Sequence, residues 1–348
     1  MLSGKDVKKF NLNLLSETSS RMITVHTKDS NDVVKNAPLE LFDSLPESRA
    51  LWIDLKHPTE KERKKVESYS KTNLLTREQS EEIESTSKYS ETPTEIISNT
   101  NYFVKNGSTF TVEPVSFIIT DSGLLLSTHN LQIDSFNTLD RRLDVNMRAC
   151  TTGYHMFITI LEAKIDYDAD MVEYVSSKIT ELNKKITESD SIDKKIIKSI
   201  SELQGNVMSL RENIYDLERV LSGIRKSVKF PKDIMGRVEL MIQDVNSLIS
   251  HSDFSFERLD YMQETAMGLI NIEQNEIVKI LSVAAVIFMP PTLVASIYGM
   301  NFKYMPELNW EFTLANGWIV PAGYIFALML MLLFTLLTLW FFRYKKWM

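Results

Sequence analysis

A stripe of small and polar residues runs along one apolar segment near the C-terminus. At about 100° per residue along an α-helix, its members lie within roughly 120° of one another. The stripe comprises Asn275, Val278, Ser282, Ala285, Met289, Thr292, Ser296 and Gly299. Two interpretations fit it. Small residues and hydroxyls allow tight packing between membrane helices, whereas in a water-filled pore they would face the lumen and Met289 would form an apolar ring that gates by dewetting.

The stripe lies within the first of two uncharged segments. No charged residue occurs between Lys279 and Lys303 or between Glu311 and Arg343, and each gap exceeds the ~20 residues that cross a hydrocarbon layer of ~30 Å. Basic residues follow the second segment, so the positive-inside rule places both termini in the cytoplasm. The pattern predicts a multi-pass protein of a prokaryotic plasma (inner) membrane, with a first span at 280–302, an outer loop at 303–316, a second span at 317–342 and a basic tail at 343–348.

Two prolines favour the pore over simple packing. Pro290 and Pro291 remove backbone donors in mid-span, and a membrane helix tolerates this where neighbouring helices or water satisfy the freed carbonyls. A subunit with two spans cannot enclose a pore alone, so the pore interpretation requires a symmetric ring of subunits.

The rest of the chain is predicted to be soluble. Residues 1–145 mix strands and helices, with a strand at 51–55 and a hairpin about the turn at 121–123. Residues 146–279 have the apolar period of long helices. They form an antiparallel pair interrupted at "ESDSID", and then a third run with a polar break at "SHSD". That last helix is expected to continue directly into the first span.

Composition excludes several functional classes. With 39 basic against 46 acidic residues, nothing indicates a nucleic-acid partner, and a single cysteine excludes a disulfide framework. The chain contains no P-loop, no G-x-S-x-G and no G-x-G-x-x-G, so neither an enzyme nor an organic cofactor is predicted. The spacing of Asp166, Asp168 and Asp170 opens like a calcium loop but lacks its glycine and final glutamate. A solvated helix start is the preferred interpretation there.

The box Tyr298-Gly299-Met300-Asn301, followed by "MPEL" and the terminal "KKWM", closely resembles the CorA family of magnesium and cobalt transport proteins. The resemblance implies a homopentamer with a funnel-shaped cytosolic domain. It also implies influx of magnesium, with cobalt and nickel as further substrates. Mg²⁺ would then be both the substrate and the regulatory ligand that gates the channel from inside.

The resemblance also assigns roles to single residues. The family's regulatory cation site does not transfer, because the corresponding stalk position holds Leu240 beside Glu239. By this resemblance Gly299, Met300 and Asn301 form the selectivity filter, and Asn275 lies at the cytosolic mouth. The hydrophobic gate is formed by Met289, Leu281 and Val278. Thr292 lines the pore, and Ser296, which belongs to the same stripe, is expected to line it too. Glu307 in the outer loop could raise the local cation concentration.

The chemistry of magnesium agrees with an uncharged filter. Mg²⁺ holds its waters tightly, so neutral oxygens can bind the hydrated ion loosely, whereas carboxylates would bind it too tightly for conduction. Two alternatives stay open. One is a zinc transporter of the same architecture, and the other is a two-span membrane scaffold or sensor.

Overall fold

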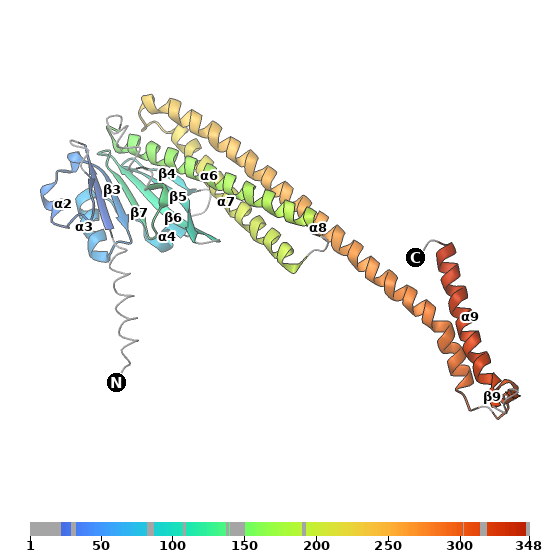
Figure 1. Ribbon diagram of the computed structural model, residues 1–348. Helices are drawn as coiled ribbons and strands as arrows, with labels where there is room; N and C mark the ends of the chain where they lie inside the picture. Colours follow the sequence, from blue (N-terminus) through green and yellow to red (C-terminus); the bar gives the residue numbers. More distant parts are fainter. Residues whose placement is uncertain are drawn as a thin grey trace, which may run out of the picture. The chain divides into compact units, whose positions relative to one another are not determined.

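The structure is a computed structural model of the chain (Figure 1). It divides into two compact units, a sheet unit (Met1–Ser189 and Asp193–Gln263) and a C-terminal unit (Asp190–Ile192 and Glu264–Met348). The structure describes residues 22–28, 33–81, 87–106, 109–136, 139, 150–189, 193–301, 303–313 and 319–345. Predictions for residues 1–21, for the "ESDSID" interruption at 190–192, for loop positions 314–318 and for tail positions 346–348 lie outside these residues.

The sheet unit contains a seven-stranded sheet in the order β2-β1-β3-β7-β6-β5-β4. Neighbouring strands are antiparallel except β3 and β7, which run parallel. The strands are β1 (Met22–Thr27), β2 (Val33–Val34), β3 (Ala50–Lys56), β4 (Tyr89–Glu91), β5 (Glu95–Asn106), β6 (Thr109–Thr120) and β7 (Leu125–His129).

The predicted strand and hairpin are confirmed. β3 contains the predicted strand at 51–55, and the helix α3 (Glu60–Ser70) follows it behind a capping box formed by Thr59 and Glu62. Strands β6 and β7 pair antiparallel about the turn at 121–123. In that turn Gly123 has φ +78°, a left-handed conformation that glycine adopts without steric cost.

Three long helices follow the sheet: α6 (Gly153–Glu188), α7 (Lys194–Lys226) and α8 (Met235–Tyr298). Helices α6 and α7 form the predicted antiparallel pair (Figure 1). The expected polar break at "SHSD" is absent, because α8 continues through it. Ser250 and Ser252 donate their hydroxyls to the carbonyls of Asn246 and Leu248, one turn earlier (3.0 and 2.9 Å), so these polar residues are satisfied by the helix itself. Shorter helical turns are α2 (Leu41–Ser44), η1 (Glu47–Arg49), α4 (Arg77–Glu81) and η4 (Lys232–Ile234).

Each face of the sheet has its own apolar core. On one face, Ile53 and Leu126 pack with Phe42 of α2 and Val66 of α3. The opposite face packs against α6, α7 and the first turns of α8 in a larger cluster that includes Phe117, Phe157, Leu217 and Val238. The α/β part and the long helices therefore share one core as far as Gln263, whereas the sequence placed a boundary at residue 145.

The three aspartates of "DYDAD" do not stand at a helix start, because α6 begins at Gly153, and one of them is buried. Asp168 lies in the middle of α6 and is only 1% exposed. Its carboxylate accepts a hydrogen bond of 2.6 Å from Lys164 Nζ. Lys164 is itself fully buried. The same Nζ also donates to Asn213 (3.3 Å) and lies 4.9 Å from the centre of the Tyr102 ring. Burial raises the pKa of Asp168, and the Lys164 ammonium opposes that shift. The solvated interpretation was wrong for Asp168, because α7 and the sheet cover its face of α6, whereas Asp166 and Asp170 are exposed.

A second buried ion pair joins the two parallel strands. His129 Nδ1 lies 2.6 Å from the Leu131 carbonyl and therefore carries a proton, and Nε2 lies 3.1 Å from the Asp54 carboxylate. Burial by itself would lower the pKa of His129, but the Asp54 carboxylate and the Leu131 carbonyl outweigh it, so the pKa is raised. None of the histidines among the described residues belongs to a group of three or more potential metal ligands.

This pair predicts a pH dependence of stability. Because the folded pKa of His129 is raised above the unfolded value of about 6.5, the pair stabilises the fold fully below that value and loses its contribution as pH rises through the folded pKa. We expect the melting temperature of the wild type to fall more steeply than that of His129→Gln as pH rises above 6.5. Thermal melts between pH 5.5 and 9 measure this difference. Equal slopes of melting temperature against pH for both proteins would contradict the prediction.

The C-terminal unit contains the last part of α8 and a second long helix, α9 (Ala322–Tyr344), joined by η5 (Pro306–Asn309), β8 (Glu311–Thr313) and β9 (Ile319–Pro321). The second span was expected to start at 317, but α9 starts at Ala322. The reason is that residues 319–321 pair with β8, and Pro321 occupies the N-cap of α9. The first helix ends at Tyr298, before the expected limit of 302, because Gly299 forms a turn.

Candidate pore-lining helix

The stripe lies on one helix, as the sequence predicted. α8 is continuous from Asn275 to Tyr298, and Gly299 follows directly. At 1.5 Å per residue these 24 steps correspond to about 36 Å, slightly more than the ~30 Å of a hydrocarbon layer. Asn275 and the Gly299 turn therefore stand near opposite surfaces of a membrane that the helix crosses.

Every member of the stripe is exposed, and the opposite face of α8 is partly covered between Val283 and Tyr298, whereas residues 271–282 are exposed on all sides. Val294 is buried, and its neighbours on that face are partly buried: Val283, Ala284, Ile287, Pro290, Pro291 and Tyr298. Helix α9 also has one covered face, which includes Gly323, Ala327 and Phe342, as expected where two helices pack together. The stripe thus faces away from the contacts that the chain makes with itself.

The three apolar residues expected to form the gate have little cover in the single chain. Met289 is 66% exposed, and Val278 and Leu281 are exposed to a similar extent. In the most apolar window of α8 only 6% of residues are buried, and in that of α9 only 11%. A core helix of a soluble protein would be mostly buried, so these two helices need lipid or other protein chains around them.

Thr292 is oriented by its own helix. Its hydroxyl donates to the Phe288 carbonyl at 2.7 Å, and so its oxygen presents lone pairs, not a proton, to its surroundings. Pro290 and Pro291 lie inside the helix and supply no N–H to the carbonyls one turn earlier. The stretch around Met289 therefore offers oxygen acceptors beside an apolar side chain.

The Gly299-Met300-Asn301 turn caps the end of the helix. Gly299 N donates to the Ala295 carbonyl (2.8 Å) and Met300 N to the Ile297 carbonyl (3.3 Å). A Cβ at Gly299 would lie 3.0 Å from the Ala295 carbonyl oxygen, so a larger residue would crowd this bond. The C-terminal end of a helix carries a partial negative charge that favours cations. The turn therefore presents the negative end of the helix dipole and the exposed Asn301 amide, and none of its three residues carries a carboxylate.

The outer loop begins beyond this turn. Lys303 is exposed and Glu307, in η5, is half-buried. The nearest acidic residues to the proposed filter are thus several positions along the chain from it, and they lie in a separate structural element.

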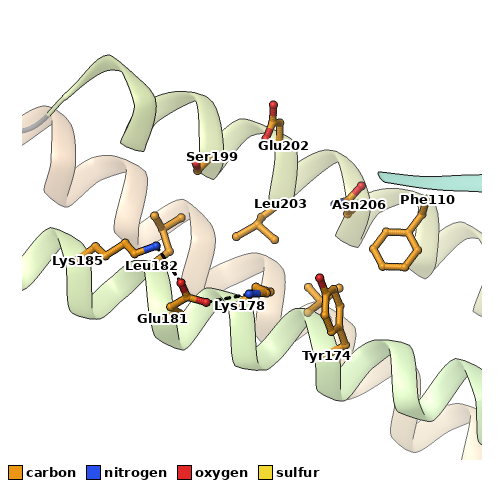
Figure 2. A pocket seen from close by; sticks show the side chains of 11 residues that line it. Phe110, Tyr174, Lys178, Glu181, Leu182, Lys185, Ser199, Glu202, Leu203 and Asn206 are labelled. Carbon is orange, nitrogen blue, oxygen red and sulfur yellow. Dashed lines mark hydrogen bonds and ion pairs between the residues drawn. The ribbon is translucent and has the colours of Figure 1, made fainter. Parts of the chain in front are cut away.

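The soluble part of the chain contains grooves of its own. One of about 600 Å³ runs between α6 and α7, and Figure 2 shows its apolar floor at Leu182 and Leu203. On its rim Glu181 accepts from Lys178 (2.9 Å) and Lys185 (2.8 Å), and these hydrogen bonds lower the pKa of Glu181 to about 2. The described residues contain no group of three or more His, Cys, Asp or Glu able to hold a metal ion.

The fold and this face define a class: a membrane protein with a soluble α/β unit, long helices, and two C-terminal spans, the first of which presents uncharged oxygens. Comparison with known proteins identifies the family. The family described as "CorA-like Mg²⁺ transporter protein" matches residues 47–346. The chain belongs to this family. The family membership predicted from the box at 298–301 is thereby confirmed.

Individual relatives match nearly the whole chain. The magnesium transport protein CorA of Escherichia coli strain K12 is 31% identical over 313 residues, which cover 89% of this chain and 96% of the relative. The protein of the same name from Wolinella succinogenes is 30% identical over 332 residues, covering 94% and 100%. The complete structure of the CorA magnesium transporter from Methanocaldococcus jannaschii has a TM-score of 0.74 at 19% identity, covering 94% and 98%, which shows a shared fold.

Proposed function

We propose that the protein carries Mg²⁺ into the cell through a pore lined by the α8 stripe of several subunits. The observation that carries the proposal is that every residue of the stripe, from Asn275 to Gly299, is exposed, and that between Val283 and Tyr298 the opposite face of α8 is partly covered. Asn275 forms the cytosolic mouth, Thr292 and Ser296 line the pore, and the turn at 299–301 is the selectivity filter. Val278, Leu281 and Met289 form the hydrophobic gate.

The assembly is a homopentamer. One α8 helix cannot surround a lumen, and its exposed apolar side chains need partners. Leu240, Phe254 and Tyr261 are exposed along the soluble part of α8 at spacings of fourteen and seven residues. Exposed apolar residues in a seven-residue register lie along one side of a helix, as they do where helices associate. The number five and the funnel shape rest on the resemblance to the family.

The filter binds the ion through its water. Mg²⁺ dehydrates reluctantly, so the Asn301 amide and the Gly299 carbonyl can accept hydrogen bonds from hydration water and release it again. Inward movement needs no nucleotide, because two charges crossing ~100 mV gain roughly 4.6 kcal/mol. No enzymatic step is proposed.

Several finer properties belong to the same proposal. The protein resides in a prokaryotic plasma membrane with both termini in the cytoplasm, since basic residues follow the second span. Cobalt and nickel are further substrates. Zinc transport is the weaker alternative, because the two curated relatives at 30–31% identity are magnesium transport proteins by name.

Intracellular Mg²⁺ regulates the pore in this proposal. It binds between acidic faces of adjacent subunits and holds the long helices closed. A site shared between subunits agrees with the lack of a metal-binding group in one chain among the residues that the structure describes.

Flux of Mg²⁺ into proteoliposomes tests both the transport and its regulation by internal Mg²⁺. We expect Mg²⁺ entry driven by an inside-negative potential, and an entry rate that falls as Mg²⁺ inside the vesicles rises. Zn²⁺ entry that exceeds Mg²⁺ entry in competition would favour the zinc alternative. No entry of any divalent cation would favour the scaffold or sensor, and entry that ignores internal Mg²⁺ would contradict only the gating.

A further inference from the structure

The outer loop contacts the second span at Trp310, through the main-chain carbonyl and the ring of this residue. Gly323 N, in the first turn of α9, donates to the Trp310 carbonyl at 3.2 Å. The first N–H groups of a helix have no partner within the helix, and Pro321 at the N-cap provides no side-chain cap. The Trp310 carbonyl therefore caps α9.

The Trp310 side chain adds a second contact with α9. Its ring packs on Phe326 with the centroids 5.8 Å apart and the planes at 60°, an edge-on geometry that aromatic rings favour. The indole is 52% exposed, so one side rests on α9 and the other is free. Directly after Trp310, Glu311 pairs with Pro321 in the β8–β9 ladder, which continues the attachment.

Glu307 belongs to the same turn. Trp310 N donates to the Glu307 carbonyl at 3.4 Å, closing η5. The hydrogen bonds of the filter turn go instead to α8, from Gly299 N to Ala295 and from Met300 N to Ile297. The acidic loop and the filter are thus anchored to different spans.

We infer that Trp310 is a positioning residue that fixes the Glu307 carboxylate above the pore entrance by docking the outer loop on α9. The inference rests on the proposed function. A carboxylate held at one place concentrates divalent cations at the mouth, whereas a carboxylate on an undocked loop is averaged over many positions. The effect belongs to capture of the ion, so it alters the half-saturating Mg²⁺ concentration and not the maximal rate.

The test compares wild type, Trp310→Ala, Trp310→Phe and the control Tyr304→Ala, the last at an exposed aromatic residue of the same loop. In Mg²⁺ flux at low ionic strength, Trp310→Ala should raise KM about fivefold and change the maximal rate less than about twofold. Trp310→Phe retains the ring contact and should stay near wild type, as should Tyr304→Ala. The KM difference should vanish at high salt, where exposed charges are screened.

A double-mutant cycle separates positioning from general damage. If Trp310 acts through Glu307, Trp310→Ala should cause no further rise of KM in a Glu307→Gln background. An equal rise in both backgrounds, or no rise in the wild-type background, overturns the inference.

Hydrogen exchange provides a test that is independent of transport. The amides of Trp310 and Gly323, which close η5 and join the loop to α9, should exchange at least tenfold faster in Trp310→Ala than in wild type, and at the wild-type rate in Tyr304→Ala. Unchanged exchange in Trp310→Ala overturns the inference even if the protein proves not to transport. Faster exchange together with a wild type that carries no Mg²⁺ would leave the docking intact and reject the proposed function alone.

Discussion

Asn301→Ala is expected to fold and insert like the wild type and to lose selective Mg²⁺ flux. Asn301 is exposed after the last turn of α8, so its amide contributes little to the stability of the chain. Hydrogen bonds to charged groups contribute about 1.5–3 kcal/mol each, which corresponds to roughly a 10- to 150-fold loss of affinity for the hydrated ion. The measurement is Mg²⁺ flux in proteoliposomes, with assembly checked by size-exclusion chromatography.

Two further variants sharpen that result. Asn246→Ala removes an exposed amide from the soluble part of the same helix and should leave flux unchanged. Asn301→Asp places a carboxylate in the filter, where it should bind the ion too tightly and slow its passage. Full flux in Asn301→Ala would reject the filter assignment, and it is the result that the scaffold or sensor alternative predicts.

Asp168→Ala should have the largest effect on stability. Its removal leaves the Lys164 ammonium buried with only Asn213 and the Tyr102 ring nearby. Removing one partner of a buried pair costs about 3–5 kcal/mol, because an uncompensated charge stays in the interior. The midpoint of chemical unfolding of the full chain in detergent, followed by circular dichroism, measures this loss.

The matched control lies on the same helix. Glu181 pairs with Lys178 and Lys185 at the surface, where water and salt screen ion pairs, so Glu181→Ala should be nearly neutral. Replacing both buried partners, as Lys164→Met with Asp168→Leu, should recover part of the lost stability because no lone charge remains. A loss in Asp168→Ala no larger than in Glu181→Ala would show that the pair is not desolvated.

Local patterns predicted the elements well. Apolar periods of three and four residues located α6, α7 and α8, and the turn at Gly123 located the β6–β7 hairpin. The predictions failed at polar side chains whose hydrogen-bond partners the sequence pattern does not show. Ser250 and Ser252 suggested a break but bond to their own helix, and Asp168 suggested solvent but lies beneath α7.

The stripe could be located from the sequence, because its residues from Asn275 to Ser296 belong to a single helix and their angular order follows from helical geometry alone. The uncharged segments, the stripe and the uncharged turn at 299–301 are properties of the sequence by itself. The roles of these residues in a filter stay a prediction.

Other features required the tertiary structure. Which face of α8 is covered depends on the packing of the C-terminal unit, and the attachment of the outer loop to α9 depends on Trp310 meeting Phe326 and Gly323 across the β8–β9 hairpin. The Lys164–Asp168 and Asp54–His129 pairs gain their strength from burial. Burial is set by segments distant in the chain, so spacing along the sequence cannot reveal it.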